Sequence, residues 1–147
     1  MELRPFQPSD LDTLYEIDQE CFPAGISYSR DELSDFIGRR GARTWVAVAE
    51  KRIVGFVVVG HEPRGVGHIV TIDVVDTTRG KGVGKALMQM VDEWAQRQVL
   101  RLIYLETAED NCLAQRFYGG LGYVKVKEIP SYYPNGATAW VMVKWLR

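Results

Sequence analysis

One segment, residues 68–106, constrains the fold of this chain more than any other. It begins with a β-branched run at 68–75, continues through a glycine-rich turn into apolar residues at helical spacing between 83 and 95, and ends with a short apolar run at 102–106. A strand, a helix and a second strand in this order form a right-handed crossover, in which the two strands are parallel. The segment therefore predicts an α/β fold.

Two helices are predicted ahead of this segment from their capping residues. Ser9 and Asp12 form a capping-box pattern before the first helix, and Ser29 and Glu32 form a second one before a shorter helix. The other runs in this part of the chain are typical of strands: residues 2–4, and residues 44–50 and 53–60, which Lys51-Arg52 joins as a tight hairpin.

The end of the chain adds one helix and one hairpin. Asn111 is expected to cap a helix that ends at Gly119-Gly120, and the alternating runs 123–129 and 138–145 predict a closing hairpin. The predicted fold class is α/β, with a mixed and mostly antiparallel central sheet of about seven strands, one parallel pair and flanking helices. With 147 residues and no internal repeat or linker, we expect a single domain over residues 1–147.

The composition argues against several classes of partner. Eighteen Lys plus Arg against nineteen Asp plus Glu leave a net charge of -1, so no overall field draws the chain to nucleic acid or an anionic membrane. Cys21 and Cys112 have no metal-ligand spacing and are too few for a disulfide framework, which is typical of a reducing compartment. No run approaches the ~18 apolar residues of a membrane span, and no signal segment opens the chain. We therefore expect a cytoplasmic protein without a metal.

The histidines give no sign of a nucleophilic site. Neither His61 nor His68 has a nucleophile or a cluster of partners near it in the sequence. Both are therefore expected to be structural or solvated.

The glycine-rich turn predicts an anion site. Its glycines let backbone N–H groups approach an anion closely, the N-terminus of the following helix adds partial positive charge, and Arg79, Lys81 and Lys85 add full charges. A Walker loop is excluded because no Gly-Lys-Ser/Thr follows at the required spacing, and the dinucleotide fingerprint disagrees with glycines at 80, 82 and 84. The expected ligand is a diphosphate; the alternative is a purely structural turn.

Two motifs then resemble those of a known family. Arg79-x-x-Gly82-x-Gly84 after a strand resembles the coenzyme A pyrophosphate signature of the GNAT acetyltransferases. The segment from Leu105-Glu106-Thr107 through Asn111, Ala114 and Phe117-Tyr118 to Leu121-Gly122-Tyr123 is similar to that family's second motif.

The flanking segments resemble one branch of that family. Phe22-Pro23 and Tyr132-Tyr133-Pro134 are similar to segments of the branch that acetylates protein N-termini, whose bacterial type is the ribosomal-protein-alanine acetyltransferase. The chain departs from this branch where Thr138-Ala139 replaces the usual acidic residue plus alanine, and where the loop after Pro134 is short. These departures bear on the choice of substrate rather than on the chemistry.

The resemblance implies acetyl-CoA as acetyl donor and no metal. It also implies that the pantetheine arm lies between the two parallel strands and bonds to their backbone as an added strand would. The backbone N–H of Val74 is the candidate donor to the oxyanion. The residues expected to bind the coenzyme are Ile72, Asp73, Val74, Val75, Arg79, Gly80, Lys81, Gly82, Val83, Gly84, Lys85, Asn111, Ala114 and Tyr118.

The acid and base also follow from the resemblance. The residue at the Glu106 position is the branch's proposed base, and the residue at the Tyr118 position is its proposed acid. Alternatively, Glu106 is a structural carboxylate, Tyr118 is a core tyrosine, and Asp73 is the rival carboxylate. The residues expected to line the amine groove are Phe22, Pro23, Tyr28, Tyr132 and Tyr133.

The expected function is transfer of acetyl from acetyl-CoA to a primary amine, with the N-terminal α-amine of a protein favoured. Two alternatives stay open: acetylation of a small-molecule amine, and a non-catalytic coenzyme A sensor. The chain is expected to be a monomer or a homodimer.

Overall fold

The computed structural model describes residues 1–147, which form one seven-stranded sheet in the order β1-β2-β3-β4-β5-β7-β6. Only β4 and β5 are parallel, and all other neighbours are antiparallel. The strands are β1 (Glu2–Pro5), β2 (Arg43–Ala49), β3 (Arg52–Glu62), β4 (Val66–Val74), β5 (Leu102–Ala108), β6 (Val124–Ile129) and β7 (Ala139–Trp145). This confirms the predicted fold class and its parallel pair.

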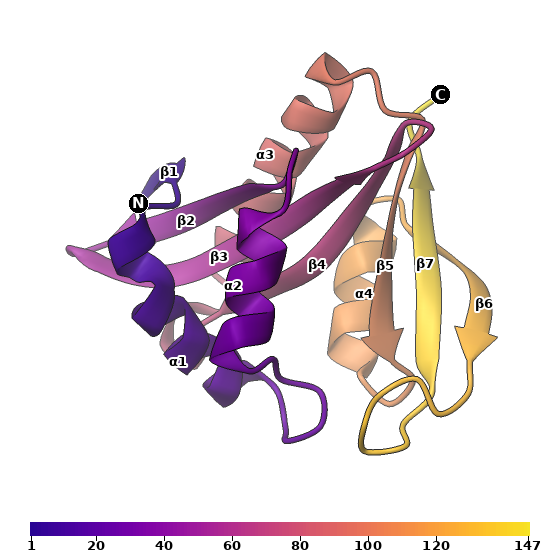
Figure 1. The fold of residues 1–147 in the computed structure, drawn as a ribbon, viewed down its shortest axis with the longest axis horizontal. Coiled ribbons are helices and arrows are strands. Elements are labelled where there is room, and N and C mark those ends of the chain that lie inside the picture. Colours follow the sequence, from indigo (N-terminus) through magenta and orange to yellow (C-terminus); the bar gives the residue numbers. More distant parts are fainter.

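Four helices cover the two faces of the sheet (Figure 1). Helices α1 and α2 lie on one face, and α3 and α4 lie on the other. Their bounds, with two short 3-10 turns, are η1 (Pro8–Asp10), α1 (Leu11–Cys21), α2 (Arg30–Gly38), η2 (Asp76–Thr78), α3 (Val83–Arg97) and α4 (Cys112–Gly120). No helix combines the length and the apolar character that a membrane crossing requires. The cytoplasmic location stays a prediction.

Each pair of helices has its own core. The α1 and α2 face packs Leu14 and Leu33 against Phe56 of β3, and the larger core under α3 includes Leu87 and Val91. All five of these side chains are fully buried, and each contributes about 2 kcal/mol. The sheet is therefore fixed from both sides.

Of the two capping boxes predicted at helix starts, one is confirmed and one is wrong. Ser29 accepts the Glu32 N–H at 3.1 Å and Glu32 accepts the Ser29 N–H at 2.9 Å, so the second capping box is confirmed. The expected box of Ser9 and Asp12 is wrong. Pro8 starts a 3-10 turn earlier in the chain, so that Asp10 accepts the Gln7 N–H at 2.8 Å and α1 begins at Leu11.

The hairpin between β2 and β3 forms as predicted, with its turn one residue earlier. Glu50 and Lys51 both have positive φ, 51° and 65°, which is typical of the type I′ turn that matches the twist of the strands.

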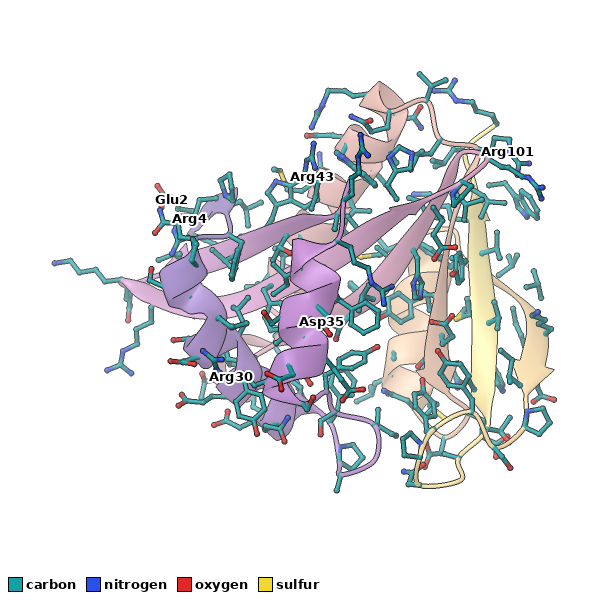
Figure 2. All side chains as sticks on the ribbon, viewed as in Figure 1. Glu2, Arg4, Arg30, Asp35, Arg43 and Arg101 are labelled. Atoms are coloured by element: carbon teal, nitrogen blue, oxygen red, sulfur yellow. The ribbon has the colours of Figure 1, made fainter.

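The parallel strands β4 and β5 pair over only three residues. Val66–His68 of β4 pairs with Leu102–Tyr104 of β5, and beyond them the two strands diverge (Figure 1). Arg101 lies at the closed end (Figure 2), where its backbone N–H and its Nε donate to the carbonyls of Gly65 and Arg64 at 2.7 and 2.8 Å. Two strand edges therefore face each other without pairing.

A bulge in β4 changes which side chains face α1 and α2. Ile69 pairs with Val59 and Thr71 pairs with Val58, so Val70 is an extra residue. An extra residue reverses the alternation of the strand, and Asp73 consequently pairs with Phe56 on the α1 and α2 face.

Candidate active site

The turn between η2 and α3 has the geometry of an open anion cradle. Gly80 and Gly82 have φ of 78° and 83°, and a Cβ at either position would meet no atom within 4 Å. Gly82 is the N-cap of the 15-residue helix α3, where backbone N–H groups have no intrahelical partner. The residues present therefore fit a diphosphate.

The charged residues of this turn differ in freedom. Lys81 and Lys85 are exposed. Arg79 is also exposed, but its Nε donates to the Val74 carbonyl at 3.0 Å and its guanidinium pairs with Asp76. Arg79 thus joins the turn to the end of β4.

Gly84 has a packing role. A Cβ there would lie 3.1 Å from the Phe117 Cζ, so glycine at this position lets the Phe117 ring pack against the first turn of α3 without a shift. This contact holds the two family-like motifs against each other.

The open edge of β4 carries Val74. Within a strand, the N–H and C=O of one residue point to the same edge. The Val74 carbonyl accepts from the Arg79 side chain. The N–H of the next residue, Val75, points to the opposite edge and donates to the carbonyl of Val54 in β3 at 2.9 Å. The Val74 N–H therefore points toward the divergence of β4 and β5, as an oxyanion donor there must.

Asn111 caps helix α4, as predicted. The Asn111 Oδ1 accepts the Ala114 N–H at 3.1 Å, which is an N-cap bond. Tyr118 lies on the same helix with 9% of its surface exposed, and its hydroxyl makes no hydrogen bond within the protein. Burial first, and then the charges of Asp73 and Tyr133, raise the pKa of Tyr118 above its usual value. Tyr118 therefore keeps its proton.

Glu106 lies beyond the last parallel pair and has a partner that the sequence did not reveal. His68 Nε2 is 2.7 Å from Glu106 Oε1, and the side chains are 15% and 14% exposed. The expectation that His68 lacks partners is wrong, because the register pairs His68 with Tyr104 and Glu106 follows on the same face.

The same face completes a small polar network around His68. The His68 ring stacks on Tyr104 with centroids 4.4 Å apart, and the Tyr104 hydroxyl donates to Glu62 at 2.7 Å. The Glu62 carboxylate also lies 3.6 Å from His68 Nδ1. A small cavity of about 80 Å³ adjoins this network; its walls include Phe36, Arg39, Glu62 and His68.

Four tyrosines surround Glu106. Burial raises the pKa of each one, and the negative charge of Glu106 adds to the effect in all four. They are Tyr28, Tyr104, Tyr132 and Tyr133. The Tyr28 hydroxyl donates to the carbonyl of the bulge residue Val70 at 3.2 Å. Three of the five residues predicted for the amine groove are thus brought together around the predicted base.

The loops that carry these tyrosines touch each other. A Cβ on Gly25, in the α1–α2 loop, would lie only 2.7 Å from the Asn135 Cβ in the β6–β7 loop. Phe22 is half-buried and Pro23 is exposed at the start of the first loop. The two loops that carry the residues predicted for the amine groove are therefore in direct contact.

Asp73, the rival carboxylate, is 1% exposed and accepts the Thr71 hydroxyl at 2.5 Å. Its side chain faces α1, where it meets Asp18, a buried residue that sequence reasoning missed. Of the two carboxylates, Glu106 is therefore the one that lies among the tyrosines predicted to line the amine groove.

The sequence pattern of the acetyltransferase (GNAT) family matches residues 11–123. The chain belongs to the GNAT family. The fold, the family and the enzyme class expected from the sequence, an acetyl-CoA-dependent N-acetyltransferase, are confirmed.

Two archaeal relatives match this GNAT chain over nearly its whole length. An uncharacterised N-acetyltransferase of Methanocaldococcus jannaschii is 33% identical over 98% of the chain and 91% of its own length. An N-alpha-acetyltransferase of Saccharolobus solfataricus is 26% identical over 97% of the chain and 91% of its own length.

Solved GNAT structures share the fold. Ard1 of Thermoplasma volcanium has a TM-score of 0.92 and 27% identity, covering 99% of this chain and 97% of its own. NAA60 of Arabidopsis thaliana in complex with acetyl-CoA has a TM-score of 0.85 and 25% identity, covering 99% and 98%. The ribosomal-protein-alanine acetyltransferase of Escherichia coli has a TM-score of 0.86 at 19% identity, covering 99% and 93%, and this likeness concerns the fold alone.

Proposed function

We propose that this chain transfers acetyl from acetyl-CoA to the α-amino group at the N-terminus of a protein or peptide, and that residues 1–147 form one acyl-CoA N-acyltransferase domain. One observation carries the proposal: Glu106 is held by His68 beside the open strand edges and is surrounded by tyrosines of two loops. The similarity to an archaeal N-alpha-acetyltransferase and to a GNAT structure in complex with acetyl-CoA also supports it.

The coenzyme would bind along one continuous path. The N–H groups of residues 79–85 and the lysines there would hold the diphosphate, and the open edge of β4 at residues 72–75 would bond the pantetheine arm. Asn111, Ala114 and Tyr118 of α4 would line the other side. Bound in this way, acetyl-CoA supplies an activated thioester.

Glu106 would accept the proton of the incoming ammonium, directly or through water. His68 donates a hydrogen bond to this carboxylate when its proton is on Nε2, which fixes the position of the carboxylate. Tyr28, Tyr132 and Tyr133 would orient the amine and its first peptide group. Phe22 and Pro23 would extend the same groove.

A single mild carboxylate suits an α-amine better than a lysine side chain. At pH 7, deprotonating an α-ammonium of pKa ~8 costs about 1.4 kcal/mol, whereas deprotonating a lysine of pKa ~10.4 costs about 4.6 kcal/mol. The Val74 N–H would stabilise the oxyanion, and the Tyr118 hydroxyl, which has no partner in the protein, would give its proton to the departing thiolate.

A panel of acceptors tests the proposal. Purified protein is incubated with acetyl-CoA and three acceptors: peptides with free N-termini, the same peptides with blocked N-termini and an internal lysine, and small amines. We expect label on free N-termini only. Label confined to small amines would replace the proposal with the small-molecule alternative, and coenzyme binding without any transfer would replace it with the sensor.

A further inference from the structure

Two buried carboxyl groups meet between α1 and β4. Asp18 of α1 is 0% exposed and Asp73 of β4 is 1% exposed, and after burial it is Asp18 that raises the pKa of Asp73 most. None of the salt bridges in the structure includes either residue. Two carboxylates without a paired cation are costly to bury in the ionised form.

One carboxyl oxygen of each aspartate accepts a hydrogen bond from another residue. Asp18 Oδ2 accepts the Tyr28 N–H at 2.7 Å, and Asp73 Oδ1 accepts the Thr71 hydroxyl at 2.5 Å. Asp18 Oδ1 and Asp73 Oδ2 are fully buried, and no donor reaches them. One proton between these two oxygens satisfies both and removes the repulsion between two negative charges.

We propose that Asp18 and Asp73 share one proton in the folded protein, and that this acid–carboxylate pair positions Tyr28 of the α1–α2 loop against β4. This loop carries part of the proposed amine groove, and β4 is the strand that would face the thioester. The positioning part rests on the proposed function. Neither residue is a catalytic residue, since both act through Tyr28 and β4.

The pair fixes Tyr28 to β4 from two sides. Asp18 binds the Tyr28 backbone N–H, and the Tyr28 hydroxyl donates to Val70 of β4 at 3.2 Å. Asp73 directly precedes Val74, the candidate oxyanion donor. A displacement of α1 from β4 would therefore disturb the amine groove and the thioester strand together.

The groups facing the pair do not supply a compensating charge close to it. Burial, and then the charge of Asp73, raise the pKa of Cys21 in α1 to about 11 and also raise the pKa of Tyr118 in α4. Both groups are therefore neutral at pH 7. The exposed Arg79 lowers the pKa of Asp73 only in part, because burial and Asp18 raise it more strongly.

The sign of the pH effect follows from this direction. The folded state holds a proton that an unfolded aspartate releases above pH ~4, so stability falls as pH rises from ~4 toward the raised pKa of Asp73. Loss of the shared proton places two like charges between α1 and β4, and we expect kcat/KM to fall as pH rises through the raised pKa of Asp73.

An infrared difference spectrum tests the shared proton without any assay of activity. The carbonyl stretch of an un-ionised carboxyl group should be present in the wild type at pH 7 and absent from Asp73→Asn or Asp18→Asn. Asp10→Asn is the matched control, because Asp10 is also buried but pairs with Arg4 at 2.9 Å. Absence of the band from the wild type at pH 7 would overturn the proposal.

A double-mutant cycle gives an independent readout. In either single asparagine variant, an amide N–H takes the place of the shared proton. In the double variant, the two amide oxygens accept from the Tyr28 N–H and the Thr71 hydroxyl, so the two NH2 groups face each other. We expect the Tm of the double variant to be lower than that of the wild type. It should also be at least about 5 °C lower than the value obtained by adding the two single-variant Tm shifts. Additive effects would contradict a shared proton.

The pH profile separates this proposal from the proposed function. With the best acceptor, Asp18→Asn should lose the fall of kcat/KM that the wild type shows as pH rises through the raised pKa of Asp73. An unchanged fall would reject the positioning role. If no amine is acetylated but the infrared band is present, the proposed function fails and the shared proton stands.

Discussion

His68 Nε2 and Glu106 Oε1 lie 2.7 Å apart, although 38 residues separate them in the chain. They meet because β4 and β5 are parallel and in register at His68 and Tyr104, immediately before the strands diverge. The carboxylate is thereby fixed at the point where the two open edges begin. This contact makes the predicted base a pair rather than a single residue.

We predict that Glu106→Gln lowers kcat/KM for the amine by about 100-fold, because the amide cannot accept a proton. His68→Gln should lower it by about 10-fold, since the carboxylate then loses its ring partner. Steady-state kinetics at several pH values measure both. Glu109→Gln, an exposed carboxylate beyond the same strand, is the control and should retain wild-type activity. Wild-type kinetics for Glu106→Gln would show that another group or water is the base.

We predict that Tyr118→Phe lowers kcat by at least 10-fold and leaves the Tm nearly unchanged, because its hydroxyl has no partner to lose. Tyr123→Phe is a closely matched control. Its ring lies 5.9 Å from that of Tyr118, and its buried hydroxyl also lacks a partner. This control should keep its kcat and have an equal or higher Tm. Equal activity of the two variants would reject Tyr118 as the acid.

We predict that Gly82→Ala weakens coenzyme A binding by at least 10-fold, as titration calorimetry would show. The substitution forces alanine to a φ of 83°, at a cost of about 1 kcal/mol, and places a methyl group in the cradle. Gly136→Ala in the β6–β7 loop imposes the same strain at a φ of 86° in open space. That control should bind coenzyme A normally, and equal weakening in both variants would remove the cradle from the binding site.

We predict a stability loss in acid from Asp10. The Arg4 hydrogen bond holds the pKa of Asp10 below its usual value, against the opposing effect of burial. Its stabilising contribution is therefore present above pH ~4 and is lost as pH falls through the lowered pKa. Asp10→Asn should have a lower Tm than the wild type at pH 7, and thermal melts should show the difference shrinking toward pH 2. A difference that does not change with pH would contradict this account.

The order of elements and the two family-like motifs could be read from the sequence because each signal is local. The apolar period of α3, the Ser29 and Glu32 box, and the Asn111 cap depend on residues within a few positions. Gly80 and Gly82 are likewise local signals, because glycine is typical of the positive φ that both adopt. These features lead to the fold class and to the coenzyme side of the candidate site.

The amine side could not be read in this way. The bulge at Val70 arises from pairing with β3, and no local signal marks it, yet it turns Asp73 toward Asp18. The partnership of His68 with Glu106 depends on the register between β4 and β5. Aligning the two strands at their shared end would have been the one available clue.

The three-residue contact between β4 and β5 divides the sheet into two blocks that share one short seam. Slow conformational freedom in this protein is thus expected to take the form of rocking of β5, β6 and β7 against β1 to β4 about the end marked by Arg101. A molecule that bridges both inner edges would suppress this rocking. Amide hydrogen exchange along residues 70–74 and 105–108 should therefore slow when coenzyme A is added.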